Sequence, residues 1–423
     1  MDENKKVSDN NINMDPAEGT EKKEQKNLKE SEGTTKIKKR HIFLYALEGI
    51  VFLAVLICTI FIFKLTRAEK LNIAKSEIKI NTNYSGGEET DISAEEESNS
   101  ESEGEKTPKR AEEVEAQKLK EAEQRAQIEK EMYEKSGGKF MLAFFGVDSR
   151  EGDLGKGTRS DSMMICSIDM DTHEVRLVSI YRDAYLNLGN GSYNKCNAAY
   201  AIGGPVQAMS MINVNTDLYV SDYVTVGFEG LVDAIDALGG VPIEVTEEEM
   251  FHLNNYQMTM AEQLGVEYKP VVFPGMQVLN GLQATAYCRI RYTKGYDFKR
   301  TERQRTVLTA MLERCSHVSL SALTSAITSI MPNVSTSLSL NDIISMLSLA
   351  SDYEVTVSDG FPFTDKVLGA TVGEKGSCII PNDLTTNVKK LHKVLFDDDN
   401  YEPSAEVKKY SNQIKENVAE YIP

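Results

Sequence analysis

The hydrophobic pattern separates a long apolar run near the N-terminus from the rest of the chain. The run Ile42–Phe63 is apolar almost throughout. A helix of that length spans about 33 Å, enough to cross a bilayer core of roughly 30 Å. The run is too long for the apolar part of a cleaved signal peptide, and no small-residue cleavage pattern closes it. We therefore predict a persistent transmembrane helix at residues 42–63.

Polar segments flank this run on both sides. Residues 1–41 are rich in Lys, Glu and Asn, which is typical of a disordered tail, and the basic cluster just before the run favours a cytoplasmic N-terminus. Residues 64–108 are rich in Glu and Ser and predict a solvated linker. Strong helix formers with interleaved charges predict a charged helical stalk at residues 109–136.

After Lys139, short apolar runs alternate with segments of helical periodicity, which indicates one domain over residues 139–397. This alternation predicts an α/β fold, in which a central mixed β-sheet is wrapped by helices in α-β-α layers. Residues 398–423 are predicted to be a C-terminal tail. We expect strands at Phe140–Val147, Met163–Ile168, Val175–Ile180, Val241–Val245 and Ala284–Tyr292, and helices at 205–214, 228–238, Asp297–His317, Ile343–Ala350 and Val388–Phe396.

Composition excludes several classes of protein. A formal net charge of −18 argues against a nucleic-acid binder, which needs a basic face, and means that an anionic ligand would require a local group of arginines or a cation. The six cysteines form no CxxC pair and the five histidines no HExxH spacing, so zinc or histidine chemistry is not indicated.

Charged residues cluster where the first predicted strands end. If the first two strands form an antiparallel pair, the end of one and the start of the next bring Asp148, Arg159 and Asp161 to one edge of the sheet. The third strand returns to that edge and ends in Arg182-Asp183. Two carboxylates at one edge suit a hard cation such as Mg²⁺. Taken alone, aspartates at loop edges are more commonly turn or cap residues.

Arginines cluster again in the second half. Arg289 and Arg291 lie two apart on a predicted strand, and Arg300, Arg303 and Gln304 share one face of the next helix. Guanidinium groups bind phosphate oxygens through two parallel hydrogen bonds, so this pattern indicates a polyanionic ligand. Alternatively, the helix arginines form a solvated face paired with Glu302.

An ordered set of motifs runs through the domain, and together they resemble the LytR-CpsA-Psr family, closely over about residues 139–320 and loosely to about 395. One departure is Tyr181, where the family usually has proline before Arg-Asp. The motifs are Phe145-Gly-Val-Asp-Ser-Arg150, Gly157-Thr-Arg-Ser-Asp-Ser-Met163, Leu177-Val-Ser-Ile-Tyr-Arg-Asp183, Lys195-Cys-Asn-Ala-Ala-Tyr200, Gly203-Gly-Pro205, Leu238-Gly-Gly-Val241, Leu279-Asn-Gly-Leu282, Arg289-Ile-Arg-Tyr292 and Asp297–Arg305.

The resemblance implies a hydrophobic tunnel for a polyprenyl chain within the fold, and roles for individual residues. Asp148 and Asp161 would hold Mg²⁺, or Mn²⁺ in its place. Asp183 and Asp297 would orient neighbouring arginines, with Arg150 and Arg303 in support. The residues expected around a pyrophosphate are Arg159, Arg182, Arg289, Arg291, Arg300 and Gln304, with Lys195 and Asn197 as further polar groups.

The activity implied by the resemblance is transfer of a glycan-phosphate polymer from polyprenyl pyrophosphate to a peptidoglycan sugar hydroxyl, with release of polyprenyl phosphate. The polymer (teichoic acid, capsule or another glycan) is not specified by the sequence. The resemblance also implies a location in the cell membrane, with the catalytic domain outside the cytoplasm. Two alternatives stay open: a non-catalytic envelope protein that binds lipid-linked glycan, and a polyprenyl-pyrophosphate hydrolase.

Overall fold

A computed structural model describes residues 78–81, 130–148 and 154–422 of the chain. The predicted tail, transmembrane helix and most of the linker and stalk lie outside these residues. Within them, no helix is both long enough and apolar enough to cross a membrane. Residues 130–135, at the end of the predicted stalk, are helical, and Met132 there is buried.

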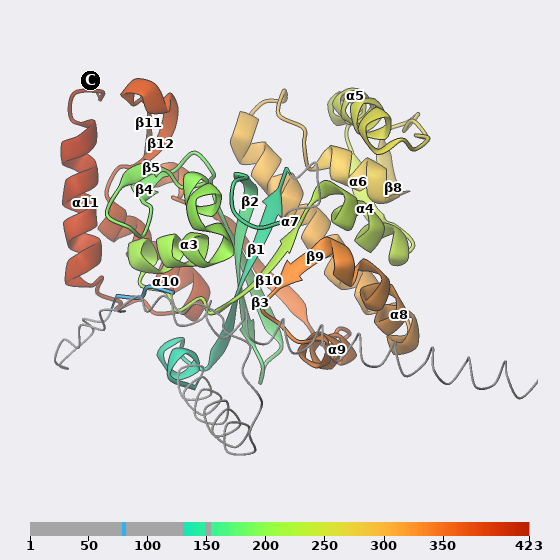
Figure 1. Cartoon of the computed structure of the whole chain (residues 1–423), viewed down its shortest axis with the longest axis horizontal. Coiled ribbons are helices and arrows are strands. Elements are labelled where there is room, and N and C mark those ends of the chain that lie inside the picture. Colours follow the sequence, from blue (N-terminus) through green and yellow to red (C-terminus); the bar gives the residue numbers. More distant parts are fainter. Residues whose placement is uncertain (1–77, 82–129, 149–153, 423) are drawn as a thin grey trace, which may run out of the picture. The chain divides into compact units, whose positions relative to one another are not determined.

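A six-stranded mixed sheet forms the centre of the domain, in the order β10-β3-β2-β1-β6-β9 (Figure 1). The pairs β1–β2 and β2–β3 are antiparallel, as the sequence predicted, whereas β1–β6 and β3–β10 are parallel. The short strand β9 lies at one edge of the sheet and pairs antiparallel with β6. The strands are β1 (Lys139–Val147), β2 (Ser160–Asp169), β3 (Glu174–Ile180), β6 (Asp222–Val226), β9 (Val334–Thr336) and β10 (Glu354–Phe361).

Helices cover both faces of the sheet, which confirms the predicted layers. The odd-numbered positions of β1, such as Met141 and Phe145, pack in a core with α3, α10 and α11. The even-numbered positions, such as Leu142, pack toward α7 and α9 on the other face. Burial on both sides explains why β1 is almost wholly apolar. These helices are α3 (Ala198–Thr216), α10 (Leu384–Phe396), α11 (Ala405–Val418), α7 (Tyr296–Cys315) and α9 (Leu340–Ser348).

A small lobe with its own apolar core lies beside the sheet and covers part of one face (Figure 1). In its two-stranded ribbon, alternate residues of one strand are buried in this core: Val241, Ile243 and Val245. The lobe consists of α4 (Phe228–Ala237), β7 (Val241–Val245), α5 (Glu247–Leu264), β8 (Gly275–Leu279) and α6 (Gly281–Tyr287).

The remaining elements are short. Helix α8 (Leu320–Ile330) packs beside α4 and α9. Two small ribbons and three single-turn 3₁₀ helices complete the described chain: β4 (Tyr185–Asn187) with β5 (Tyr193–Lys195), β11 (Val367–Thr371) with β12 (Ser377–Pro381), η1 (Met331–Asn333), η2 (Thr364–Lys366) and η3 (Gly373–Lys375).

The strand predicted at Ala284–Tyr292 is wrong. Helix α6 occupies the first part of this segment, and the residues from Cys288 to Gly295 form turns and irregular backbone. A capping box explains the helix, because the Asn280 side chain accepts a hydrogen bond from the Gln283 backbone N–H at 2.9 Å while the Gln283 side chain accepts from the Asn280 N–H. Arg289 and Arg291 therefore do not share a strand face.

The C-terminal tail predicted at 398–423 is also wrong. Helix α11 lies within it, and its residues Val407, Ile414 and Val418 are buried in the main core. Its N-cap Ser404 donates to Asp217 Oδ1 at 2.7 Å, which ties the helix to the end of α3. The folded domain therefore extends beyond residue 397.

His392 makes the stability of this C-terminal region sensitive to acid. Its ring stacks on Tyr401 with centroids 3.4 Å apart, and its Nε2–H donates to the Thr216 carbonyl at 2.8 Å. Burial lowers the pKa of His392 to about 4, against the opposing effects of Thr216 and Asp217. Because a histidine in the unfolded chain has a pKa near 6.5, the unfolded state binds a proton that the folded state excludes between these values.

We expect the free energy of unfolding to fall as the pH drops from about 6.5 toward 4, by about 2 kcal/mol at pH 5 for this group. Thermal unfolding at pH 7, 6 and 5 measures the effect. His392→Gln keeps an N–H donor without a titrating ring and should flatten this dependence. The exposed His317→Gln variant is the control, and equal pH dependence in both variants would contradict the assignment.

Candidate active site

The edge where β1 ends and β2 begins carries the first group of predicted residues. Val147 is paired with Ser160, so Asp148 and Arg159 leave the sheet next to each other, and Asp161 lies just inside β2. Asp148 and Arg159 are exposed and form no ion pair with any residue that the structure describes. Arg150 lies outside the described residues.

Asp161 is the centre of an arginine cluster that comes from the end of β3, from the irregular segment before α7 and from α7 itself. Its Oδ1 accepts a hydrogen bond from Arg182 Nη1 at 2.9 Å. Its Oδ2 lies 3.3 Å from Arg291 Nη2 and 3.2 Å from Arg300 Nη2. The sequence predicted that these residues would meet, although Arg291 reaches the cluster from irregular backbone and not from a strand.

The neighbouring arginines determine the direction in which the pKa of Asp161 is shifted. Burial would raise the pKa of Asp161, but the charges of Arg300, Arg182 and Arg291 outweigh it, so the pKa lies below its ordinary value. Burial in turn lowers the pKa of Arg300, although that of a guanidinium is so high that the group stays charged at neutral pH. The site thus holds a fixed carboxylate among three permanent cations.

Two further carboxylates, Asp183 and Asp297, lie in ion-pair contact with the arginines. Asp297 Oδ2 lies 3.5 Å from Arg182 Nε, and its Oδ1 lies 3.7 Å from Arg300 Nη1. Asp183 contacts Arg182 Nε at 3.6 Å and Lys195 Nζ at 2.9 Å. Lys195 is therefore part of the same network.

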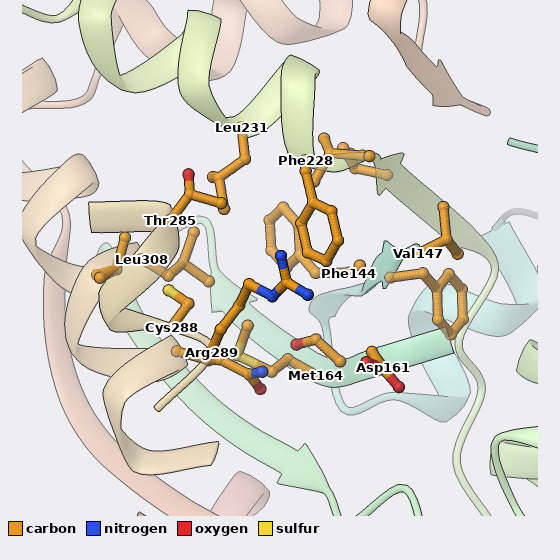
Figure 2. A pocket seen from close by; sticks show the side chains of 18 of the residues that line it. Phe144, Val147, Asp161, Met164, Phe228, Leu231, Thr285, Cys288, Arg289 and Leu308 are labelled. Atoms are coloured by element: carbon orange, nitrogen blue, oxygen red, sulfur yellow. The ribbon is translucent and has the colours of Figure 1, made fainter. Parts of the chain in front are cut away.

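An apolar pocket opens beside the cluster, with Arg300, Gln304 and Asp161 in its lining (Figure 2). Arg289 also lines it and stacks on Phe228, with 4.5 Å between the guanidinium carbon and the ring centroid, and more distantly on Tyr256. The apolar lining comes from the sheet and from α4 and α7: Phe144, Met164, Val224, Val226, Leu231, Val307, Leu308 and Met311.

The pocket wall depends on a close approach of α4 and α6. A Cβ atom at Gly281 would lie 2.1 Å from the Val232 carbonyl oxygen, so only glycine fits at the start of α6. The preceding Asn280 caps the same helix. The Leu279-Asn-Gly-Leu282 motif thus positions α6, whose Thr285 lines the pocket, against α4.

The helix arginines are buried, so the interpretation of a solvated face paired with Glu302 is wrong. Arg300, Arg303 and Arg305 are 3%, 4% and 6% exposed, and Glu302 pairs with Lys299 instead. Arg303 does not join the cluster around Asp161. Its Nε donates to Glu249 Oε1 at 2.7 Å, and its Nη1 and Nη2 donate to the Ile290 carbonyl and Thr293 Oγ1 at 3.2 and 2.7 Å.

Sequence reasoning missed Glu249, Phe228 and Tyr256, which position Arg303 and Arg289. Glu249 stands in the capping box of α5 with Thr246, and this Thr-x-x-Glu spacing was its one sequence signal. Asn197 is buried beside the N-terminus of α3, and its Oδ1 accepts no hydrogen bond from the described residues.

Tyr181 fills the position before Arg182-Asp183. Its ring meets Phe298 edge-on at 4.6 Å between centroids, and a Cβ at Gly360 would lie 2.1 Å from its hydroxyl oxygen. The tyrosine is thus accommodated by a glycine on β10, and the strand end keeps its charged pair in place.

The two carboxylates fit a divalent cation only together with an additional ligand. Among the described residues, no group of three His, Cys, Asp or Glu side chains could hold a metal ion by itself. Both oxygens of Asp161 accept from guanidiniums, whereas Asp148 is exposed. Mg²⁺ is commonly held by one or two carboxylates when phosphate oxygens and water complete its shell. Asp148 and Asp161 suit an ion of that kind bound beside a phosphate group.

These features describe a mixed α/β protein with a cluster of arginines around a carboxylate at the mouth of an apolar pocket. Comparison with known proteins identifies a family for this chain. The sequence model of the LytR_cpsA_psr family matches residues 96–365, and the chain belongs to this family.

Several relatives carry names that describe an activity. The polyisoprenyl-teichoic acid–peptidoglycan teichoic acid transferase TagU of Enterococcus faecalis is 30% identical over 217 residues, which cover 51% of this chain and 65% of that protein. TagV of Bacillus subtilis, a transferase with the same description, is 28% identical over 269 residues. These residues cover 62% of this chain and 66% of TagV. The chain thus spans just under two thirds of the length of each of these two relatives.

A solved structure shares the fold. The protein gbs0355 of Streptococcus agalactiae superposes with a TM-score of 0.51 at 26% identity, over 63% of this chain and 90% of that protein. The mixed sheet with helices on both faces therefore also occurs in that protein.

Proposed function

We propose that the protein transfers a glycan-phosphate polymer from a polyprenyl-pyrophosphate carrier to a sugar hydroxyl of peptidoglycan. The observation that carries the proposal is the convergence of Arg182, Arg291 and Arg300 on Asp161 at the mouth of an apolar pocket. Family membership and the names of the relatives TagU and TagV support a transferase that acts on a lipid-linked envelope polymer.

The arrangement suits the two chemically different ends of such a donor. The arginines supply guanidinium forks for the pyrophosphate, with Arg159 and Lys195 as further cations at the same edge. The apolar pocket would take the first part of the prenyl chain, and Arg289 and Gln304, which line the pocket, would lie where the prenyl chain joins the pyrophosphate. The expected tunnel for the whole chain would be an extension of this pocket.

The reaction is a phosphoryl transfer between two oxygens. The acceptor hydroxyl attacks the phosphorus nearest the glycan, a new P–O bond forms, and the bond to the bridging oxygen breaks. Polyprenyl phosphate leaves with that oxygen, and the hydroxyl proton ends on the released phosphate, so the reaction needs no co-reactant. The chain's own contribution is to position the donor and to stabilise the charge spread over the phosphate oxygens.

Asp148 and Asp161 would hold Mg²⁺, or Mn²⁺, next to the bound pyrophosphate. When bound, the cation would neutralise charge on the leaving phosphate. Either Asp148, which is exposed, or Asp161, which accepts hydrogen bonds from the arginines, would pass on the hydroxyl proton. The apolar run at 42–63 supports a membrane-anchored enzyme whose domain acts outside the cytoplasm, where lipid-linked glycans are used.

Product analysis tests this function. The full-length protein in detergent is incubated with a synthetic prenyl-pyrophosphate disaccharide, a peptidoglycan tetrasaccharide and Mg²⁺, with and without EDTA. We expect a phosphodiester-linked product and free prenyl phosphate, and loss of both with EDTA.

Other outcomes favour the alternatives. Prenyl phosphate without a linked product would indicate a hydrolase, and binding of the donor without either product would indicate a non-catalytic protein. Undiminished transfer in EDTA would remove the cation from the proposal.

A further inference from the structure

Three ring side chains lie together one residue away from the arginine cluster. Tyr292 follows Arg291, and its ring lies 6.1 Å from that of His252, which in turn lies 5.4 Å from Phe251. Tyr292 is 71% exposed and Phe251 65%. We call Phe251, His252 and Tyr292 the aromatic platform.

The platform is held in place by a buried ion pair. Arg303, whose side chain is 4% exposed, donates to Glu249 in the first turn of α5 and to the Ile290 carbonyl and Thr293 Oγ1. The same guanidinium therefore fixes the helix that carries Phe251 and the irregular segment that carries Tyr292. The buried guanidinium thus joins the two backbone segments that carry the exposed rings.

The position of the platform separates it from the pocket. Neither Phe251 nor Tyr292 lines the apolar pocket, whereas the neighbouring Arg291 reaches Asp161 Oδ2 at 3.3 Å. A ligand on the platform would thus lie beside the phosphate site but outside the prenyl site. Exposed apolar side chains gathered next to a polar site are typical of a binding surface.

A pyranose ring fits these rings chemically, because it presents apolar C–H groups on its face and hydroxyls at its edge. The donor already has two strong attachments, its pyrophosphate on the arginines and its prenyl chain in the pocket. The acceptor sugar offers the arginines only an uncharged hydroxyl, so its position must come from other contacts. We propose that the aromatic platform binds a sugar ring of the acceptor glycan, with Tyr292 closest to the reacting phosphorus; this rests on the proposed function.

Steady-state kinetics with the full-length protein test this site, with the prenyl-pyrophosphate disaccharide as donor probe and the peptidoglycan tetrasaccharide as acceptor probe. Tyr292→Ala should raise the KM for the acceptor about 3- to 10-fold and leave the KM for the donor unchanged, since one aromatic contact is lost. Phe251→Ala should have a smaller effect of the same kind. Tyr292→Phe keeps the ring and should restore wild-type KM.

Direct titration of the tetrasaccharide without donor provides a readout that does not depend on turnover. Its Kd should rise by the same factor in Tyr292→Ala. The matched control is Tyr421→Ala, which removes an exposed ring (36%) near the C-terminus and should leave the Kd unchanged.

The outcomes separate this inference from the proposed function. Transfer by the wild type with an unchanged acceptor KM in the Phe251→Ala/Tyr292→Ala double variant would overturn the platform alone. A raised KM for the donor in place of the acceptor would also overturn it, because the ring would then face the donor glycan. Platform-dependent tetrasaccharide binding by a wild type that transfers nothing would support the platform and contradict the proposed function.

Discussion

Replacing Arg300 by alanine is expected to lower kcat/KM for transfer by about 10²- to 10³-fold, the loss typical of one preorganised charge donor at a reacting oxyanion. Arg300 lies 3.2 Å from Asp161 Oδ2, lines the pocket and has a side chain only 4% exposed. Its charge therefore acts where little water screens it, and its loss cannot be offset by solvent. The prenyl phosphate and linked product are measured with the synthetic donor and acceptor.

Arg314→Ala is the matched control, because Arg314 lies on the same helix α7 and donates to the Leu238 carbonyl at 3.0 Å, away from the cluster. It should transfer at the wild-type rate. Since Arg300 is buried, its variant could unfold, so thermal unfolding is measured in parallel. Arg182→Ala, with a side chain 21% exposed, should show a comparable loss of transfer with less effect on stability. Folded Arg300→Ala and Arg182→Ala proteins with wild-type rates would exclude the arginine cluster from the reaction.

Deletion of residues 398–423 is expected to unfold the domain. The deletion removes Val407, Ile414 and Val418 from the main core, and burial of each aliphatic side chain stabilises the fold by about 1.5–3 kcal/mol. It also removes the Ser404 hydroxyl from Asp217 and the Tyr401 ring from His392. Because domains are stable by only about 5–15 kcal/mol, the truncated protein should show no cooperative thermal transition.

A point substitution in α11 tests the same contact less drastically. Ile414→Ala should lower the free energy of unfolding by about 2–5 kcal/mol, whereas Lys409→Ala, on the exposed side of the same helix, should change it by less than about 0.5 kcal/mol. Denaturant titration measures both. A truncated protein that unfolds cooperatively at the wild-type midpoint would mean that residues 398–423 are a dispensable tail after all.

The sequence correctly predicted those elements whose hydrophobic pattern is compatible with only one arrangement. A nine-residue apolar strand such as β1 needs cover on both faces, and the structure supplies it. Strand β7 has the predicted bounds, Val241–Val245, because Gly239-Gly240 and Thr246 delimit it. The meeting of Asp161 with Arg182 followed from the antiparallel pairing of β2 with β3, which the short turn at 170–173 favours.

Other features could not be decided from the chain alone. The segment after Asn280 is short and apolar, a pattern that suits a strand or a buried helix equally, and its capping box and packing on α4 decide for a helix. Helix α11 has apolar residues at helical spacing, but nothing in the sequence indicated which surface of the domain would bury them.

The sequence by itself thus determined the layered α/β class, the first three strands and the identity of the charged groups, because these follow from local hydrophobic periodicity and residue type. Only the tertiary structure decided which charge meets which partner. Arg303 and Glu249 stand 54 positions apart, and Arg300 and Asp161 stand 139 apart. A guanidinium can pair with any carboxylate it reaches, so the choice rests on how the lobe packs against the sheet.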